Sequence, residues 1–275
     1  MYALTYCILD ENYANMEPFK EIIPFLKESR ITKALMENHK CYESHVRMFW
    51  KSVRYDEKEK TIYSAVQKKD ENGQDIDVEV KFTVAEVRRV LDLKDSDDDP
   101  IIIPERLSKG LWFRMGYTGH VNDKYLKSRF CRPYKFVVHC VVQALSHRKG
   151  AYDETPDYIM NIITCLVLNR PYNISQVLFN HMIDNIKGEK YIMYSRFIQM
   201  LLDDQVPNLP KDPVDELKLQ HMSSDTLNRL NKYKDLIEDQ EPRVKGMIEK
   251  LKNPDYVALE NDEWRHENNN SEARD

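Results

Sequence analysis

The second half of this chain repeats apolar residues at helical spacing, and that pattern most limits the fold that its 275 residues can adopt. Between residues 133 and 202, apolar side chains recur every three or four positions, as in helices that bury one face. Thr155-Pro156-Asp157 and Asn173 are typical helix starts, and Gly150 and Gly188 are typical stops. The pattern predicts a multi-helix globular domain. Its expected core consists of Val137, Cys140, Val141, Ile159, Ile162, Ile163, Leu166, Val177, Leu178, Phe197 and Leu201.

The spacing changes between about residues 60 and 82, where apolar and polar residues alternate as they do in half-buried strands. Asn72-Gly73 interrupts the alternation, and this dipeptide favours a tight hairpin turn. Thr83 and Glu86 then form a capping-box pattern that opens a helix. Because an isolated hairpin is marginal in water, we expect it to pack on helices or to gain a strand, for which residues 101–103 are the candidate.

Three prolines, Pro207, Pro210 and Pro213, end the helical pattern and mark the clearest boundary in the chain. The expected fold class is mainly α (α+β): a multi-helix globular domain with a small β-hairpin subdomain and a helical C-terminal appendage, which begins with a helix at residues 214–219. The expected parts are a main domain at 1–206, a Pro-rich linker at 207–213, a charged helical appendage at 214–258 and a disordered tail at 259–275.

Composition argues against several classes of protein. No apolar run approaches the roughly eighteen residues of a membrane span, and the first residues lack the basic start of a signal peptide. The five cysteines are scattered and odd in number, so we expect reduced thiols in the cytoplasm or nucleus.

No motif in the sequence indicates catalysis, because the nucleophile elbow, the P-loop and the Gly-rich dinucleotide turn are all missing from it. The acids at 95–99 are expected to form a solvated loop. The acids considered for a metal-dependent enzyme are Asp92, Asp95, Asp203 and Asp204, which would have to converge in one pocket. The sets considered for zinc are His39, Cys41 and His45, and Cys131, His139, Cys140 and His147. Neither set has a CxxC pair, so we predict no catalytic, cofactor-binding or metal-binding residues and no cofactor.

Positive charge gathers between residues 105 and 150, which carry ten Lys and Arg against two acids in a chain of net charge −5. Aromatic residues lie among these cations, as in sites that grip phosphates and stack bases. The same pattern fits core aromatics with cations on the solvent side, and the sequence pI of about 6.0 favours that reading. The candidate nucleic-acid or partner surface is Lys124, Lys127, Arg129, Arg132 and Lys135.

Six short blocks occur in an order that points to a family. They are residues 21–26, Phe49-Trp50, residues 82–87, Met115-Gly116-Tyr117, residues 134–139 and residues 191–197. Together, over about residues 17–204, they resemble the gag-like, plant-transposon domain of proteins encoded by plant retroelements. Ser195 stands where members of this family often have Pro, and no CCHC zinc knuckle or protease, reverse-transcriptase or integrase motif is present in the sequence. The resemblance implies an assembly or nucleic-acid-associated role and no catalytic residues.

These observations predict a non-enzymatic, retrotransposon-derived interaction or assembly domain that self-associates, with no membrane partner. Amphipathic segments after Pro213 support the self-association. One alternative is a module that binds RNA or DNA through the basic 105–150 segment. The other is a metal-dependent nuclease or phosphoryl-transfer enzyme.

Overall fold

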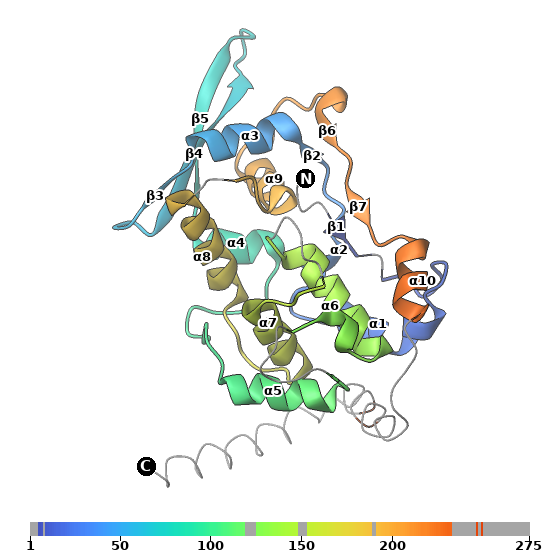
Figure 1. Ribbon diagram of the computed structural model, residues 1–275. Helices are drawn as coiled ribbons and strands as arrows, with labels where there is room; N and C mark the ends of the chain where they lie inside the picture. The colour runs from blue at the N-terminus through green and yellow to red at the C-terminus, as the bar shows by residue number, and fades with distance from the viewer. Residues whose placement is uncertain are drawn as a thin grey trace, which may run out of the picture.

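The computed structural model describes residues 5–7, 9–118, 125–147, 153–188 and 191–232, together with Gly246 and Glu249. Over these residues the chain is mainly α-helical with small sheets, which confirms the predicted fold class (Figure 1). The α-helices are α1 (Ile23–Lys27), α2 (Thr32–Met36), α3 (Glu43–Ser52), α4 (Val84–Leu91), α5 (Glu105–Arg114), α6 (Arg132–Leu145), α7 (Asp157–Val167), α8 (Ile174–Lys187), α9 (Ser195–Gln205) and α10 (Ser224–Lys232). The 3-10 helices are η1 (Glu17–Ile22), η2 (Lys127–Arg129) and η3 (Pro213–Asp215). The strands are β1 (Thr5–Tyr6), β2 (Cys41–Tyr42), β3 (Arg54–Asp56), β4 (Thr61–Lys69), β5 (Asp75–Phe82), β6 (Glu216–Leu217) and β7 (Gln220–His221).

The helix α6 lies in the middle of the helical core and is buried on nearly every side. Pro133 occupies its first turn, where the missing N–H would have no partner within the helix. Phe136 stacks on Phe19 of η1 with ring centroids 4.7 Å apart. All the predicted core residues are at most 8% exposed. Each large apolar side chain buried in this way contributes roughly 1.5–3 kcal/mol relative to exposure.

The predicted hairpin forms from β4 and β5, which pair antiparallel from Ile62–Phe82 at the base to Lys69–Asp75 near the turn. Gly73 has φ of 79°, a left-handed conformation that glycine adopts without steric cost. A third strand, β3, pairs with the start of β4.

Residues 101–103 do not supply this third strand, contrary to expectation. Pro100 and Pro104 bracket the segment and cannot donate a ladder hydrogen bond, and Ile102 remains 77% exposed. The strand β3 takes this place because it follows α3 after one residue and so lies beside the start of β4.

Two helix starts, those of α4 and α8, follow local sequence signals. At α4, the Glu86 carboxylate accepts a hydrogen bond from the Thr83 backbone N–H at 2.7 Å, which completes the predicted capping box. At α8, the Asn173 side chain caps the first turn at 2.9 Å. Thr155 does not cap α7, because Pro156 takes the N-cap position and the buried Thr155 hydroxyl has no hydrogen-bond partner among the described residues.

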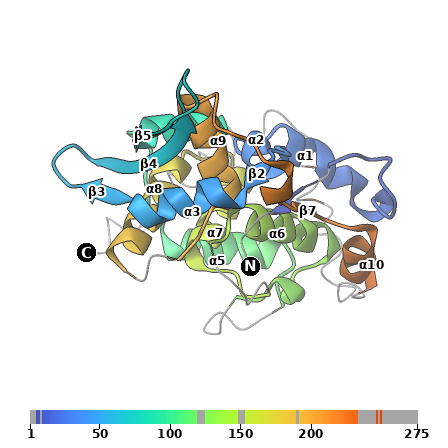
Figure 2. The ribbon, with the colours of Figure 1, turned by 90° about the horizontal axis from the view of Figure 1, so that it is seen from above.

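The chain after the helical core returns across the molecule as a strap, which we define as residues 206–232. In the strap, β6 pairs antiparallel with β2, and β7 pairs parallel with β1. The helix α10 then packs on α6 and buries Leu227 and Leu230. Figure 2 shows α10 and the β3–β4–β5 sheet on opposite sides of the helical core. Residues 214–232 of the predicted appendage therefore lie against the main domain.

The helix expected at residues 214–219 does not form. The Asp212 carboxylate accepts a hydrogen bond from the Val214 backbone N–H at 2.8 Å and opens η3, after which β6 pairs with β2. The predicted tail at 259–275 and most of the appendage beyond residue 232 lie outside the described residues. Within the described ranges, no helix has the length and apolar character that crossing a membrane requires.

Candidate functional site

The structure divides the predicted basic residues between solvent and interior. Arg129 on η2 is exposed, while Lys127 and Arg132 are half-buried. Lys135 on α6 is only 3% exposed. Lys124 lies outside the described residues. The described members therefore do not share one solvent-facing surface.

Lys127 lies against α6, where its Nζ is 3.1 Å from Nδ1 of His139. Burial lowers the pKa of His139 to about 3, and the charges of Lys127 and Arg229 add to this effect. Burial also lowers the pKa of Lys127, where Arg229 and Lys135 add to the effect and Asp153 opposes it. Cations from η2, α6 and α10 thus meet around a neutral imidazole, an arrangement that no spacing in the sequence indicated.

Aromatic side chains of the basic segment form a cluster in the core. The Trp112 ring lies 4.5 Å from Phe130, 4.8 Å from Tyr125 and 5.8 Å from Tyr117, measured between centroids. Trp112 is 1% exposed, and the other three rings are also buried. These four aromatics are core residues, so they are not accessible for stacking on bases.

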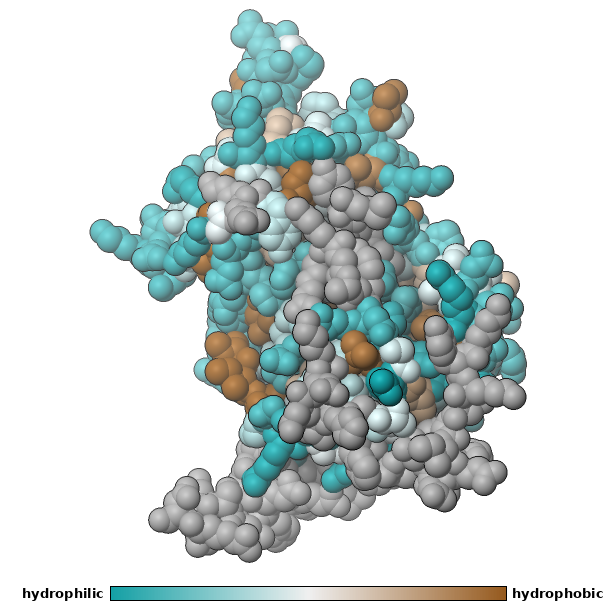
Figure 3. Space-filling model, viewed as in Figure 1, coloured by the Kyte–Doolittle hydropathy of each residue, from teal (hydrophilic) through white to brown (hydrophobic). Residues whose placement is uncertain are grey.

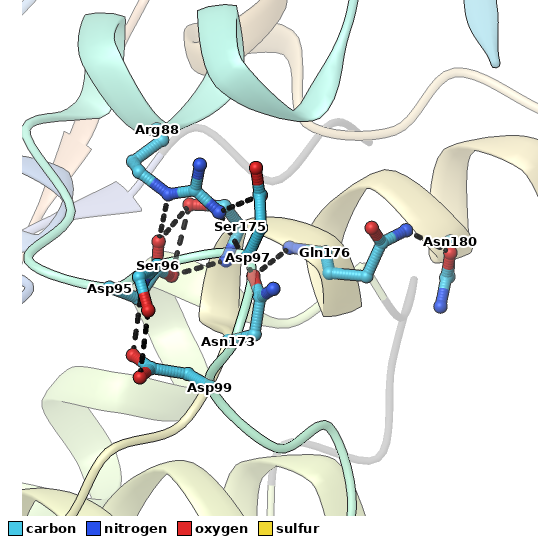
Figure 4. Close-up of polar contacts among 9 residues, drawn as sticks. All are labelled: Arg88, Asp95, Ser96, Asp97, Asp99, Asn173, Ser175, Gln176 and Asn180. Carbon is cyan, nitrogen blue, oxygen red and sulfur yellow. Dashed lines mark hydrogen bonds and ion pairs between the residues drawn. The ribbon is translucent and has the colours of Figure 1, made fainter.

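The acidic loop between α4 and α5 is tied to α8 (Figure 4). Asp95, only 1% exposed at its side chain, accepts a hydrogen bond from Arg88 Nε at 2.5 Å. It also accepts from the backbone N–H and the hydroxyl of Ser175, at 2.7 and 2.8 Å. Arg88 donates further to Asp97 at 2.7 Å and to Asn173 at 3.5 Å. At Asp95 the expectation of a solvated loop is therefore wrong, because this carboxylate joins α4 to the start of α8.

The other acids considered for metal binding serve separate ion pairs. Asp204 binds Arg89 at 2.8 Å, while the two oxygens of Asp203 lie 2.8 Å from His39 and 3.2 Å from Lys211. Burial opposes ionisation of Asp203, but hydrogen bonds from His39 and Lys211 outweigh it, so its pKa is lowered. Among the described residues, no group of three or more His, Cys, Asp or Glu is placed to hold a metal ion.

The residues considered for zinc have partners of other kinds. His45 Nε2 lies 2.8 Å from the Pro210 carbonyl oxygen. The Cys41 thiol donates to the His39 carbonyl at 3.3 Å, and burial raises its pKa to about 12. His147 packs on His181 of α8 with ring centroids 4.5 Å apart. Burial lowers the pKa of His181 to about 4, and the neighbouring His147 adds to this effect.

A projecting hairpin arm, which we define as residues 67–79, was not singled out from the sequence. It rises from the body in Figure 1, and Figure 3 shows this projection as mainly hydrophilic. Val66 and Val80 are buried at its base, whereas Ile76 is 39% exposed. Strands rise about 3.3 Å per residue, so the three residues of β4 beyond Val66 extend the arm by about 10 Å.

Two side chains reveal which backbone groups face away from the hairpin. The Ser52 hydroxyl donates to the Ala65 carbonyl at 3.1 Å and accepts from the Ala65 N–H at 3.0 Å. The Gln205 carboxamide accepts from the Lys81 N–H at 3.0 Å and donates to the Lys81 carbonyl. Along an antiparallel ladder, both groups of a residue point to one side, and the side alternates. The odd-numbered residues of β4 and β5 therefore direct their backbone groups outward.

Beyond these two edge-capping side chains, both edges of the arm are open as far as the described residues are concerned. The outward groups belong to Gln67 and Lys69 on β4 and to Asp75, Asp77 and Glu79 on β5. No hydrogen bond to any of these outward backbone groups occurs within the described part of the chain. An unpaired strand edge is a template on which another chain can add a strand.

The arm is also acidic, with two lysines against five Asp and Glu residues between positions 67 and 79. Asp75 pairs with Lys69 at 3.1 Å, and Glu79 pairs with Arg54 at 3.2 Å. All four side chains are more than half exposed, so these pairs contribute little and leave the carboxylates accessible. Asp77, between them, has no ion-pair partner among the described residues.

Comparison with known proteins gave no relative. No protein-family model matches this chain, and searches of curated proteins and of solved structures found no match.

Proposed function

We propose that this chain is a non-enzymatic interaction and assembly domain that acts through its hairpin arm. The observation that carries the proposal is the pair of open edges on the arm. Proteins normally shorten, cover or cap such edges, and here Ser52 and Gln205 cap them only next to the body. The sequence resemblance to the gag-like domain of plant retroelements supports the same function. Because the five cysteines are free and buried, the reducing cytoplasm or nucleus is the compartment that we propose.

Self-association is part of this proposal, with the arm of one copy holding a segment of a second copy. Asp77→Pro tests it, because proline removes an outward N–H while the β4–β5 ladder uses the even-numbered residues. Asp77→Thr is the matched control, since it removes the same charge but keeps the N–H and suits a strand.

Sedimentation velocity of the full chain over a range of concentrations separates the outcomes. We expect wild type and Asp77→Thr to associate as concentration rises and Asp77→Pro to stay monomeric. Circular dichroism of each variant controls for folding. Association that is unchanged in a folded Asp77→Pro variant, or a strictly monomeric wild type at the highest concentration, contradicts the proposal.

Nucleic-acid binding is a second candidate, favoured by the cations that meet at η2, α6 and α10. Arg229 is the exposed member of this group and is close enough to Lys127 to affect its pKa, while Arg129 is exposed on the same short helix, η2, as Lys127. Lys and Arg at such positions bind phosphates by releasing counterions, which makes the affinity depend on salt.

Charge reversal tests this candidate. Arg129→Glu and Arg229→Glu should weaken binding to single- and double-stranded probes and reduce the slope of log affinity against log salt. Lys58→Glu, at an exposed lysine in the turn between β3 and β4, is the control that should change neither quantity. A wild-type chain that shows no salt-sensitive binding to these probes rules the candidate out.

A further inference from the structure

The outer edge of β5 has a more specific chemistry than that of β4. On β4, Ser52 already occupies the Ala65 backbone, so only the short stretch at the tip is open. On β5, Asp75, Asp77 and Glu79 offer consecutive outward backbone groups, and their side chains lie on one face because strand side chains alternate. A strand added to β5 would therefore meet a row of three carboxylates on one face of the sheet.

The opposite face of the β5 edge is apolar. Ile76 and Val78 alternate with the three acids, and Ile76 is 39% exposed while Val78 is half-buried against the core. Apolar side chains of an added strand would thus extend a surface that already continues into the folded body. The β5 edge is therefore acidic on one face and apolar on the other, so the two faces of an added strand meet different surfaces.

A second arm does not suit this edge. If two arms pointed the same way and paired, their folded bodies would have to lie about 4.8 Å apart, which is the spacing of neighbouring strands. The folded body seen in Figure 2 is far wider than this, so the two bodies would collide. Two arms that point in opposite directions would pair β5 with β5 antiparallel. That arrangement places Asp75 opposite Glu79 or Asp77 opposite Asp77 on one face, and like charges directly opposite one another are destabilising.

We infer that the β5 edge binds an extended peptide segment in which Lys or Arg alternates with apolar residues. Its backbone pairs with the outward groups of Asp75, Asp77 and Glu79, and its cations lie opposite these carboxylates. Main-chain hydrogen bonds supply affinity in this mode of recognition, and alternate side chains supply specificity. The inference rests on the proposed interaction function and names the partner of the same edge. A second copy of the chain provides this segment, in keeping with the proposed self-association.

A labelled peptide with the sequence Lys-Val-Lys-Val-Lys-Val-Lys is the probe, and fluorescence anisotropy with the full chain is the measurement. We expect binding to wild type and a loss of about tenfold or more in Asp77→Pro, because the ladder is interrupted at its centre. Asp77→Thr should lose only about two- to fivefold, since it removes one exposed ion pair. A peptide in which glutamate replaces lysine should not bind, and a peptide with its valines grouped at one end should bind far more weakly.

Equal binding of the alternating and grouped lysine peptides would show simple charge attraction and overturn the inference. Unchanged binding to a folded Asp77→Pro variant would do so as well. If the probe fails to bind while sedimentation still shows association that Asp77→Pro removes, the partner chemistry is wrong and the proposed function stands. If Asp77→Pro changes neither measurement, the proposed function itself is wrong.

Discussion

Removal of the Arg88 guanidinium, which ties α4 to the acidic loop that follows it, should be strongly destabilising. Arg88→Met keeps most of the apolar stem but leaves the Asp95 carboxylate, 1% exposed at its side chain, without its cation. Among the described residues, the Ser175 backbone N–H and hydroxyl would then be the remaining hydrogen-bond donors to this carboxylate. Removing one partner of a buried pair typically costs 3–5 kcal/mol, or about 3 kcal/mol here because Arg88 is 18% exposed.

Two further substitutions give the order of effects that this geometry requires. Asp95→Asn leaves Arg88 with Asp97 and partial access to water, so we expect a loss of about 1.5–3 kcal/mol, typical of a hydrogen bond to a charged group. Asp97→Asn should cost no more than about 1 kcal/mol, because Asp97 is 79% exposed. The Arg88→Met/Asp95→Asn double variant should be less destabilised than the sum of the single variants, since the two residues are in contact.

Urea unfolding, followed by circular dichroism and by tryptophan fluorescence, measures these differences. We expect the urea midpoint to fall least in Asp97→Asn, further in Asp95→Asn and most in Arg88→Met. The slope of unfolding free energy against urea concentration should stay unchanged, which marks a change in stability alone. Coincident transitions by the two probes are the control for cooperative unfolding. Equal losses in Arg88→Met and Asp97→Asn would refute the reasoning, because they would mean that burial of Asp95 does not matter.

Three further predictions address other buried groups and the sheet edge. The pKa values of His139 and His181, about 3 and about 4, lie below the usual 6.5. As the pH falls, these two histidines therefore become protonated in the unfolded chain before they do so in the folded chain. Their contribution to stability is therefore complete above about pH 6.5 and is lost by up to about 1.4 kcal/mol per histidine for each pH unit below it. Urea midpoints at several pH values should show a shallower loss in His139→Leu than in wild type. Arg196→Lys should lower the free energy of unfolding, measured in urea, by about 1–3 kcal/mol, because the buried guanidinium donates to two carbonyls at the end of α2 and lysine cannot reproduce that fork. Gln205→Ala should open the β5 edge further and increase association in sedimentation velocity, and unchanged association would contradict its role as an edge cap.

Local signals in the sequence predicted the parts of the fold that depend on neighbouring residues. The hairpin follows from alternation around Asn72-Gly73, and the start of α4 follows from the capping box at Thr83. The strap could not be predicted in this way, because β6 exists only through pairing with β2, far away in the sequence. The charged residues 214–219 have helical spacing and predict a helix, but in the folded chain part of this segment pairs with β2 as a strand.

The predicted basic surface illustrates the same limit. Lys135 has the sequence context of a solvent-facing lysine, yet it is 3% exposed on a helix that is covered on nearly every side. The helix α10, whose Arg229 affects the pKa of Lys127, lies about one hundred residues after Lys127 along the chain. The open arm was missed for a related reason: alternation predicts a hairpin but not how far it extends beyond its support, and Ser52 and Gln205 show where capping stops.

Backbone amide hydrogen exchange along β5, read residue by residue by NMR in the dilute chain, tests the open edge most directly. The geometry predicts an alternating pattern, with Ile76, Val78 and Val80 protected by β4 and with Asp77 and Glu79 exchanging fast. Lys81 should be protected despite its odd position, because Gln205 accepts its hydrogen bond. Uniform protection from residue 76 to residue 81, or slow exchange at Asp77 and Glu79 in a monomeric chain, would contradict the open edge.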